Sequence, residues 1–343
     1  MKIGLVLSGG GAKGAYQVGM VQSLAKHGIE VAMVSGASIG SLNGGIVASA
    51  PNIAIAAQRL NEVWALVAEE GVLEVNKKAI PRYLMMLAAA GLTGPGRVGV
   101  SLLSSIYGAT DHSGILATTP LSRILDRYLS PTDLANGKNL FVSLYPYSGR
   151  LGALSDLLKG EFLQRFDTRE SVFRHIQSLN EVDQREALLA SAAIPVLFTP
   201  RKVEGEIYSD GGQGNYRKAQ GNTPITPLLD KGLDAIIVSH LSDGSLWSAD
   251  DFPDETILEV RPASRISDSS LDMLGFDGEK IQAWIDQGRA DSDVLLDKLS
   301  RYAGARSSLR EADATLGDKV DKHAEGLEST SLEAVMRRLR GSD

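Results

Sequence analysis

The chain has 343 residues, 43% of them hydrophobic, which is enough to fill the core of one large domain or two ordinary ones. Its 42 acidic and 35 basic residues give a net charge of −7, which argues against the broad basic face that nonspecific binding of nucleic-acid polymers needs. It has no cysteine, so disulfide frameworks, thiolate catalysis and cysteine-ligated metal sites are excluded.

No export signal or membrane-spanning segment is expected. The apolar run at the start of the sequence, MKIGLVLSGGG, is broken by glycines and by Lys13 before it reaches the length of a signal-peptide core. The most apolar stretch, which begins at Ile80, is too short to span a bilayer and contains Arg82. The cytoplasm is therefore the expected compartment.

A βαβ unit is predicted at the start of the chain. Residues 2–8 and 30–36 are apolar runs typical of buried parallel strands, and residues 15–28 between them have the pattern of a helix. Strands that alternate with helices favour an α/β fold, with a mainly parallel central sheet and helices on both faces. Further elements are expected downstream: a helix over 119–129 and strands over 140–147 and 235–241.

The composition changes after about residue 243. The segment SDGSLWSADDFPDE is acidic and loop-like, and from Ser269 the chain is polar, charged and rich in helix-forming residues. We therefore expect an α/β domain over residues 1–245 and a mainly helical extension over 246–343 that packs on this domain or caps it. The acidic segment lacks the spacing of an EF-hand loop, so no metal site is expected there.

The first chemical motif is GGGAKG, which lies between the first strand and the first helix. Gly9, Gly11 and Gly14 fit the dinucleotide pattern GxGxxG, but the end of the second strand carries no acid to hold a ribose. A phosphate-binding P-loop fits less well, because Lys13 precedes the last glycine. Backbone N–H groups in such a loop, followed by a helix N-terminus, can hold an oxyanion as readily as a phosphate.

The second motif is GASIG, which fits GxSxG between a strand and a helix. In this setting a strained turn exposes the serine oxygen, and the glycines on either side relieve crowding. Two consecutive parallel strands would place this turn beside the glycine loop, at the same edge of the sheet. Ser38 is therefore a candidate nucleophile next to an oxyanion hole; the alternative is a glycine-rich turn without chemistry.

A serine nucleophile needs a base. His112 and His240 are conceivable bases, but neither lies in a recognisable motif, and His27 is expected to end the first helix. A better candidate is Asp210, in EIYSDGGQGN, which ends a short strand and precedes two glycines that permit close approach of the backbone. A lone DGG is also an ordinary turn signal.

Together these segments resemble the patatin-like phospholipase family. GGGAKG, GASIG, ASAAIPVLFTP at 190–200 and YSDGG at 208–212 occur in the family's order, and the resemblance spans residues 1–240. It implies a patatin-like fold with a Ser–Asp dyad and no catalytic histidine, in which Ser38 is the nucleophile and Asp210 its base. It also implies an oxyanion hole made by the backbone of Gly9, Gly10 and Gly11.

The resemblance also indicates which residues shape these loops. Lys13 stands where the family often has arginine, a tolerable change if the side chain supplies charge and a poor one if it makes a two-pronged contact. The ASAAIP segment is expected to be scaffolding beside the Asp210 loop. The supporting positions are Lys13, Gly14, Gly36, Gly40, Gly211 and Gly212.

The implied activity is hydrolysis of membrane phospholipids or lysophospholipids, by peripheral contact with the inner face of the membrane and without a metal or organic cofactor. Residues 80–107 could form an acyl-chain pocket or a lid, or an ordinary buried helix and loop. Arg337, Arg338 and Arg340 follow apolar residues near the end of the sequence, which fits either a contact with anionic lipid or a solvated helix end.

Three further interpretations stay open. Some bacterial patatin-like proteins that resemble this chain act as anti-phage effectors and degrade the host membrane when a cyclic nucleotide binds. A cyclic nucleotide activator is therefore one interpretation for this chain, although no motif in the sequence identifies its pocket. A nucleotide-binding oxidoreductase could use the glycine loop and would tolerate Ser38→Ala. A noncatalytic regulatory protein on the same fold is disfavoured by the presence of both Ser38 and Asp210.

Overall fold

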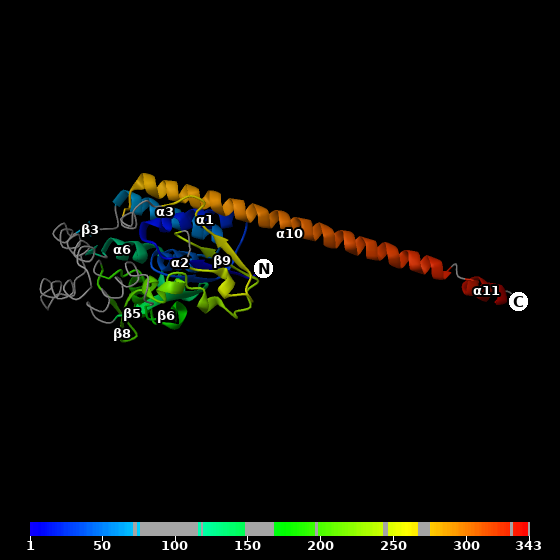
Figure 1. Cartoon of the computed structure of the whole chain (residues 1–343), viewed down its shortest axis with the longest axis horizontal. Coiled ribbons are helices and arrows are strands. Elements are labelled where there is room, and N and C mark those ends of the chain that lie inside the picture. Colours follow the sequence, from blue (N-terminus) through cyan, green and yellow to red (C-terminus); the bar gives the residue numbers. More distant parts are fainter. Residues whose placement is uncertain are drawn as a thin grey trace. The chain divides into compact units, whose positions relative to one another are not determined.

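Figure 1 shows a computed structural model of the chain. It describes residues 1–70, 74–75, 116–117, 119–147, 168–195, 198–242, 246–266, 275–329 and 332–341. The predicted pocket or lid segment at 80–107 and the histidine at position 112 lie outside the described residues. The chain divides into two compact units, Met1–Asp293 and Val294–Asp343.

The first unit is built on an eight-stranded sheet. Its parallel strands are β1 (Ile3–Leu7), β2 (Val31–Gly36), β5 (Asn139–Pro146), β9 (Ala235–Ser239) and β10 (Ile257–Val260), and its antiparallel strands are β6 (Val172–His175), β7 (Arg201–Val203) and β8 (Glu206–Asp210). The strand order is β10-β9-β1-β2-β5-β8-β7, and β6 also pairs with β5. The mainly parallel sheet is therefore confirmed, with an antiparallel extension at one side.

The central strands explain why the sheet forms. β1 and β9 have the sequences IGLVL and AIIVS, and every residue in both strands is buried. Continuous apolar runs of this kind are typical of parallel strands that are covered on both faces. The predicted strands all occur, with small differences at their ends. A separate antiparallel pair joins β3 (Glu74–Val75) to β4 (Leu116–Ala117).

One face of the sheet is covered by α-helices. Gly44 of α2 lies over Leu7, Val34 and Leu140, so side chains from three neighbouring strands pack under this helix. Helices α1 and α3 pack against each other next to it (Figure 1). Among the described residues before β7, the α-helices are α1 (Ala15–Lys26), α2 (Ile39–Ser49), α3 (Ile53–Glu70), α6 (Thr119–Tyr128), α7 (Pro131–Ala135) and α9 (Glu181–Ser191).

The opposite face is covered by 3₁₀ helices and loops. Val6, Ile236 and Val238 pack there in one apolar cluster with Ile225, Leu228 and Trp247. Helices on both faces are therefore found, with short 3₁₀ turns on this second face because its glycine-rich and proline-containing connections do not sustain an α-helix. Within the described residues of this unit, the 3₁₀ helices are η1 (Gly11–Gly14), η3 (Ile176–Ser178), η4 (Gly211–Gln213), η5 (Tyr216–Lys218), η6 (Thr226–Leu228) and η7 (Ala249–Asp251). Of these, η1 contacts α1 and α2, and η3 contacts α7 and α9.

The first unit continues past the expected boundary after residue 245. β10 pairs with β9, and the long helix α10 (Gly278–Ser329) begins against α1. A Cβ at Gly19 would collide with the carbonyl oxygen of Ile285, and one at Gly288 with that of Tyr16, so glycines let the two helix backbones touch. Two features extend the unit to Asp293: the short strand ILEV, which the sequence analysis had placed in the extension, and the contact between α1 and α10.

The second unit consists of the rest of α10 and the helix α11 (Leu332–Arg340), so the helical extension is present. None of the helices in the described ranges is long and apolar enough to cross a bilayer.

Candidate active site

Ser38 lies in a strained turn between β2 and α2. Its φ and ψ are 52° and −127°, which is an unfavourable conformation for a residue with a side chain. A Cβ at Gly36 would collide with the carbonyl oxygen of Gly40, and one at Gly40 with that of Leu7. The two glycines are therefore what allows the turn to form, as the GxSxG pattern predicts.

Asp210 accepts a hydrogen bond from Ser38. The distance from Ser38 Oγ to Asp210 Oδ2 is 2.6 Å, although 172 positions separate the residues. Asp210 ends β8, which pairs with β5, and a Cβ at Gly211 would collide with the carbonyl oxygen of Ser143. Ser38 and Asp210 are each only 6% exposed. The fold thus brings the two predicted dyad residues into direct contact.

The environment of Asp210 changes its acidity. Burial raises the pKa of this carboxyl group to about 6, while hydrogen bonds from the hydroxyl of Ser38 and the N–H of Gly212 oppose the rise. The Gly212 N–H donates to Oδ1 at 2.8 Å, so both carboxylate oxygens are engaged. The predicted desolvation is confirmed. A carboxylate with this pKa is a stronger base than an exposed aspartate and is still ionised at neutral pH.

The glycine loop lies beside Ser38, but its first glycine differs from expectation. A Cβ at Gly9 would be 3.0 Å from the Cβ of Ser38, so the loop and the turn are in contact. The Gly9 N–H, however, donates to the carbonyl oxygen of Asn222 at 3.1 Å. It is therefore already used inside the protein and is not a donor to an oxyanion in this conformation. Within the described ranges the structure records no acceptor for the N–H groups of Gly10 and Gly11.

The other two loop positions have structural roles. Gly14 lies against the first residue of α2, where a Cβ would be 2.5 Å from Cγ1 of Ile39. Lys13, in η1, passes close to Gly10, with its Cε 3.4 Å from where a Cβ at Gly10 would lie. The contact of Gly14 with Ile39 joins the loop to α2, whereas the contact of Lys13 with Gly10 lies within the loop.

Ser191 is a site residue that sequence analysis placed only within scaffolding. Its Oγ accepts from the N–H of Ser38 at 3.0 Å and donates to the carbonyl oxygen of Ser143 at 2.7 Å. Two residues on, the carbonyl oxygen of Ala193 accepts from the N–H of Asp210 at 2.9 Å. The ASAAIP segment therefore holds the backbone of both dyad residues. The run of small residues marks a tightly packed segment, but nothing in it names these partners.

Asn222 is a second residue that sequence analysis missed. Besides accepting from Gly9, it donates from Nδ2 to the Gly9 carbonyl oxygen at 3.4 Å. Its Oδ1 would be 2.7 Å from a Cβ at Gly212. Asn222 therefore lies between the glycine loop and the Asp210 loop. The sequence GNTP around it gives only a turn signal.

None of the histidines in the described ranges is hydrogen-bonded to Ser38 or Asp210. His240 is buried, and its Nε2 lies 2.8 Å from Oε2 of Glu259, which also pairs with Arg261. Burial, and then the charge of Arg261, lower the pKa of His240 to about 3. His27 caps the end of α1, as predicted, and His175 stacks on Phe141. His323 is exposed on α10.

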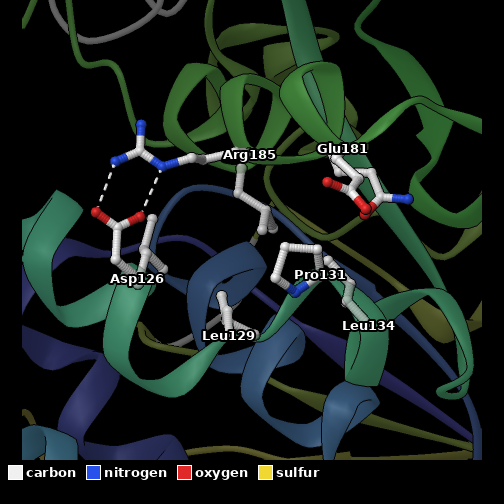
Figure 2. Close-up of a pocket in the computed structure, with 9 residues that line it drawn as sticks. Asp126, Leu129, Pro131, Leu134, Glu181 and Arg185 are labelled. Carbon is white, nitrogen blue, oxygen red and sulfur yellow. Dashed lines mark hydrogen bonds and ion pairs between the residues drawn. The ribbon is translucent and has the colours of Figure 1, made fainter.

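A pocket of about 140 Å³ lies among α6, α7 and α9 (Figure 2). Arg185 donates to both carboxylate oxygens of Asp126 at its rim, at 2.9 and 3.1 Å. Its apolar lining is Leu125, Leu129, Pro131, Leu134 and Leu188. None of the predicted site residues lines it. Among the described residues no group of three or more acidic or histidine side chains could hold a metal ion.

A comparison with protein-family models identifies the chain's relatives. The model described as patatin-like phospholipase matches residues 5–229, which is more than half of the chain. The chain belongs to this family. The patatin-like fold and the hydrolase class predicted from the sequence are thereby confirmed at the level of the family, and the match includes both glycine motifs, Ser38 and Asp210.

Individual relatives of this patatin-like chain match over short stretches. Lysophospholipase NTE1 of Candida albicans is 45% identical over 71 residues, which is 19% of this chain and 5% of the relative. Neuropathy target esterase sws of Drosophila melanogaster is 48% identical over 63 residues, 18% of this chain and 4% of the relative. The match thus spans a small part of these relatives. The crystal structure of VipD from Legionella pneumophila aligns with 87% of this chain and 67% of its own, with 16% identity and a TM-score of 0.39.

Proposed function

We propose that this chain is a serine lipid acyl hydrolase that cleaves ester bonds of membrane phospholipids or lysophospholipids. The observation that carries the proposal is the 2.6 Å hydrogen bond from Ser38 Oγ to Asp210 Oδ2 at a buried turn. Matches to a lysophospholipase and an esterase support the substrate class. The oxidoreductase alternative is weakened, because β2 ends in serine and glycine and supplies no acid for a ribose.

The first half of the reaction acylates the enzyme. Ser38 Oγ attacks the ester carbonyl carbon while Asp210 Oδ2 takes the hydroxyl proton, and the carbonyl oxygen becomes an oxyanion. We assign its stabilisation to the N–H groups of Gly10 and Gly11; losing one such donor costs about 3 kcal/mol in studied hydrolases. The intermediate then collapses, the bond to the leaving alcohol breaks, and that alcohol takes the proton from Asp210.

The second half releases the fatty acid. Water attacks the acyl carbon and gives a proton to Asp210, and the new intermediate collapses as the proton returns to Ser38 Oγ. Both halves use one carboxyl group that accepts and returns a single proton. The raised pKa of Asp210, about 6, suits this exchange near neutral pH.

Regulation and cellular place are finer parts of the proposal. We propose peripheral action at the inner, cytoplasmic face of a membrane, with activation by a cyclic nucleotide in an anti-phage response. The support is the resemblance of the sequence motifs to bacterial effectors of this kind. None of the described residues is assigned to the nucleotide.

The test is fatty-acid release from mixed bacterial phospholipid vesicles, with and without a panel of cyclic di- and trinucleotides. Wild type is compared with Ser38→Ala, Asp210→Ala and the control Ser49→Ala, whose hydroxyl bonds only within α2, to the Ile46 carbonyl oxygen. Release by wild type and the control, lost in both dyad variants, supports the hydrolase. Dependence on one nucleotide supports regulation. Equal release by wild type and Ser38→Ala contradicts the proposal.

A further inference from the structure

Helix α11 exposes a row of large apolar side chains. Leu332, Val335, Met336 and Leu339 are 82%, 44%, 47% and 69% exposed. They recur at intervals of three and four positions, so they line one side of a nine-residue helix. We call these four residues the α11 stripe. A helix this short is marginal in water on its own, and an exposed stripe of this kind is usually covered by something apolar.

Basic residues border the stripe. Arg337, Arg338 and Arg340 are all exposed, and the acid described in the same helix is Glu333. With about 100° between successive residues, Arg340 lies next to Met336 at one edge of the stripe and Arg338 lies next to Val335 at the other. Arg337 lies on the opposite side. The helix is thus locally cationic in a chain whose net charge is −7.

The apolar stripe and its flanking arginines distinguish between two partners that could cover the stripe: a second copy of α11 and an anionic bilayer. A second copy of α11 packed on the stripe would bring its Arg338 and Arg340, the two arginines at the edges, close to those of the first copy, at an electrostatic cost. An anionic bilayer accepts both parts: the stripe enters the boundary between headgroups and acyl chains, and the arginines reach the phosphates beside it. We propose that α11 docks the protein on anionic phospholipid bilayers. The proposal deepens the hydrolase proposal and rests on it for the identity of the bilayer as substrate, but docking itself does not require Ser38.

The direct test is cosedimentation of the full chain with vesicles, in a Ser38→Ala background so that the lipid is not consumed. Vesicles of phosphatidylglycerol with phosphatidylcholine are compared with phosphatidylcholine alone. We expect Leu332→Gln/Leu339→Gln to weaken binding to the anionic vesicles at least ~tenfold. Arg337→Gln/Arg338→Gln/Arg340→Gln should weaken it on the order of 100-fold and abolish the preference for the anionic vesicles.

Val182→Gln is the matched control, because Val182 is another exposed apolar residue, 71% exposed, on α9 of the first unit. It should bind as the parent does. Equal binding by the parent and both α11 variants overturns the proposal, as does absence of binding by the parent. If the leucine variant instead lowers the mass measured by light scattering and leaves vesicle binding unchanged, a second copy covers the stripe and the proposal is wrong.

A second readout separates this proposal from the hydrolase proposal. With Ser38 present, both α11 variants should hydrolyse a soluble short-chain p-nitrophenyl ester as wild type does and lose vesicle hydrolysis at least ~tenfold. Loss of soluble-ester hydrolysis in the variants contradicts a docking role. If wild type itself does not hydrolyse the soluble ester or the vesicles, the hydrolase proposal fails, whereas the binding result still decides whether α11 docks on lipid.

Discussion

The backbone N–H of Ser38 and the side chain of Ser191 are joined by a 3.0 Å hydrogen bond across 153 positions of sequence. The Ser191 hydroxyl also donates to the carbonyl oxygen of Ser143 on β5, so the strained turn is tied to the sheet. All three residues are buried. Removing the hydroxyl would therefore take the acceptor from the buried N–H of Ser38 and one donor from the buried carbonyl oxygen of Ser143.

Ser191→Ala should lower kcat for vesicle hydrolysis by roughly 10- to 100-fold with little change in KM, because the Ser38 oxygen loses its position and the lipid contacts remain. It should also lower the free energy of unfolding by about 1–3 kcal/mol. Steady-state kinetics and urea unfolding measure both effects. In Ser49→Ala, the matched serine at the far end of α2, kcat should stay near wild type. An unchanged kcat in Ser191→Ala would reduce Ser191 to a purely structural residue.

The rate of hydrolysis should depend on the ionisation of Asp210. Because the reaction needs the carboxylate, kcat/KM should rise with pH through about 6, the pKa of this group, and then level off. A pH profile on a soluble ester measures this limb without changing the charge of a membrane. A rise of kcat/KM near pH 4 would contradict a raised pKa of Asp210 in a desolvated site. A pH profile unchanged by Asp210→Asn would contradict the role of Asp210 as the base.

The same group should make stability depend on pH. Its pKa is about 6 in the folded state and 3.8 as the ordinary value, so the folded protein binds the proton more tightly than the unfolded chain. Proton binding by Asp210 therefore contributes about 3 kcal/mol to the free energy of unfolding. This contribution is fully present below pH 3.8 and is lost as the pH rises through 6. Wild type should therefore lose stability relative to Asp210→Asn between pH 4 and 7, as measured by urea unfolding at each pH. A constant difference contradicts the prediction.

The two glycines that flank Ser38 should not tolerate a side chain. Gly36→Ala and Gly40→Ala each place a Cβ against backbone oxygen, which cannot move as a side chain can. Each should lower the free energy of unfolding by about 3 kcal/mol or abolish folding. Gly278→Ala is the control, because its Cβ would meet Ala68 at an ordinary 3.7 Å. Wild-type stability in Gly40→Ala would show that the turn differs from the one described.

His240 should be dispensable for chemistry. Its Nε2 faces Glu259, and its ring packs on Trp247. His240→Gln should therefore keep hydrolysis within a few-fold of wild type while lowering the melting temperature, since a buried contact to a charged group is weakened. Fatty-acid release at matched folded concentration is the measurement. A loss as large as that in Ser38→Ala would restore histidine as the base.

Much of the fold could be predicted because its signals are local. The βαβ unit follows from apolar runs on either side of a helical pattern, and the turn at Ser38 follows from glycines whose missing Cβ atoms are required there. Such signals need no knowledge of distant residues. The contact between Ser38 and Asp210 was inferred only because several motifs together resemble a family.

The missed features depend on tertiary contacts. The N–H of Gly9 donates to the carbonyl oxygen of Asn222, 213 positions away, and no sequence pattern around either residue predicts this hydrogen bond. The strand Ile257–Val260 was hidden by the acidic loop before it, although it completes the sheet beside β9. Glycine spacing shows where backbone can approach closely, but the partner that approaches is decided by the rest of the fold.

The most direct test of the Ser38–Asp210 dyad is covalent trapping with an alkyl fluorophosphonate, followed by peptide mapping by mass spectrometry. Wild type and Ser49→Ala should each form one phosphonyl adduct, on Ser38. Ser38→Ala should form none, and the labelling rate of Asp210→Asn should fall at least ~100-fold, since the serine then lacks its base. An adduct on another residue, or equal labelling of wild type and Asp210→Asn, would contradict the dyad.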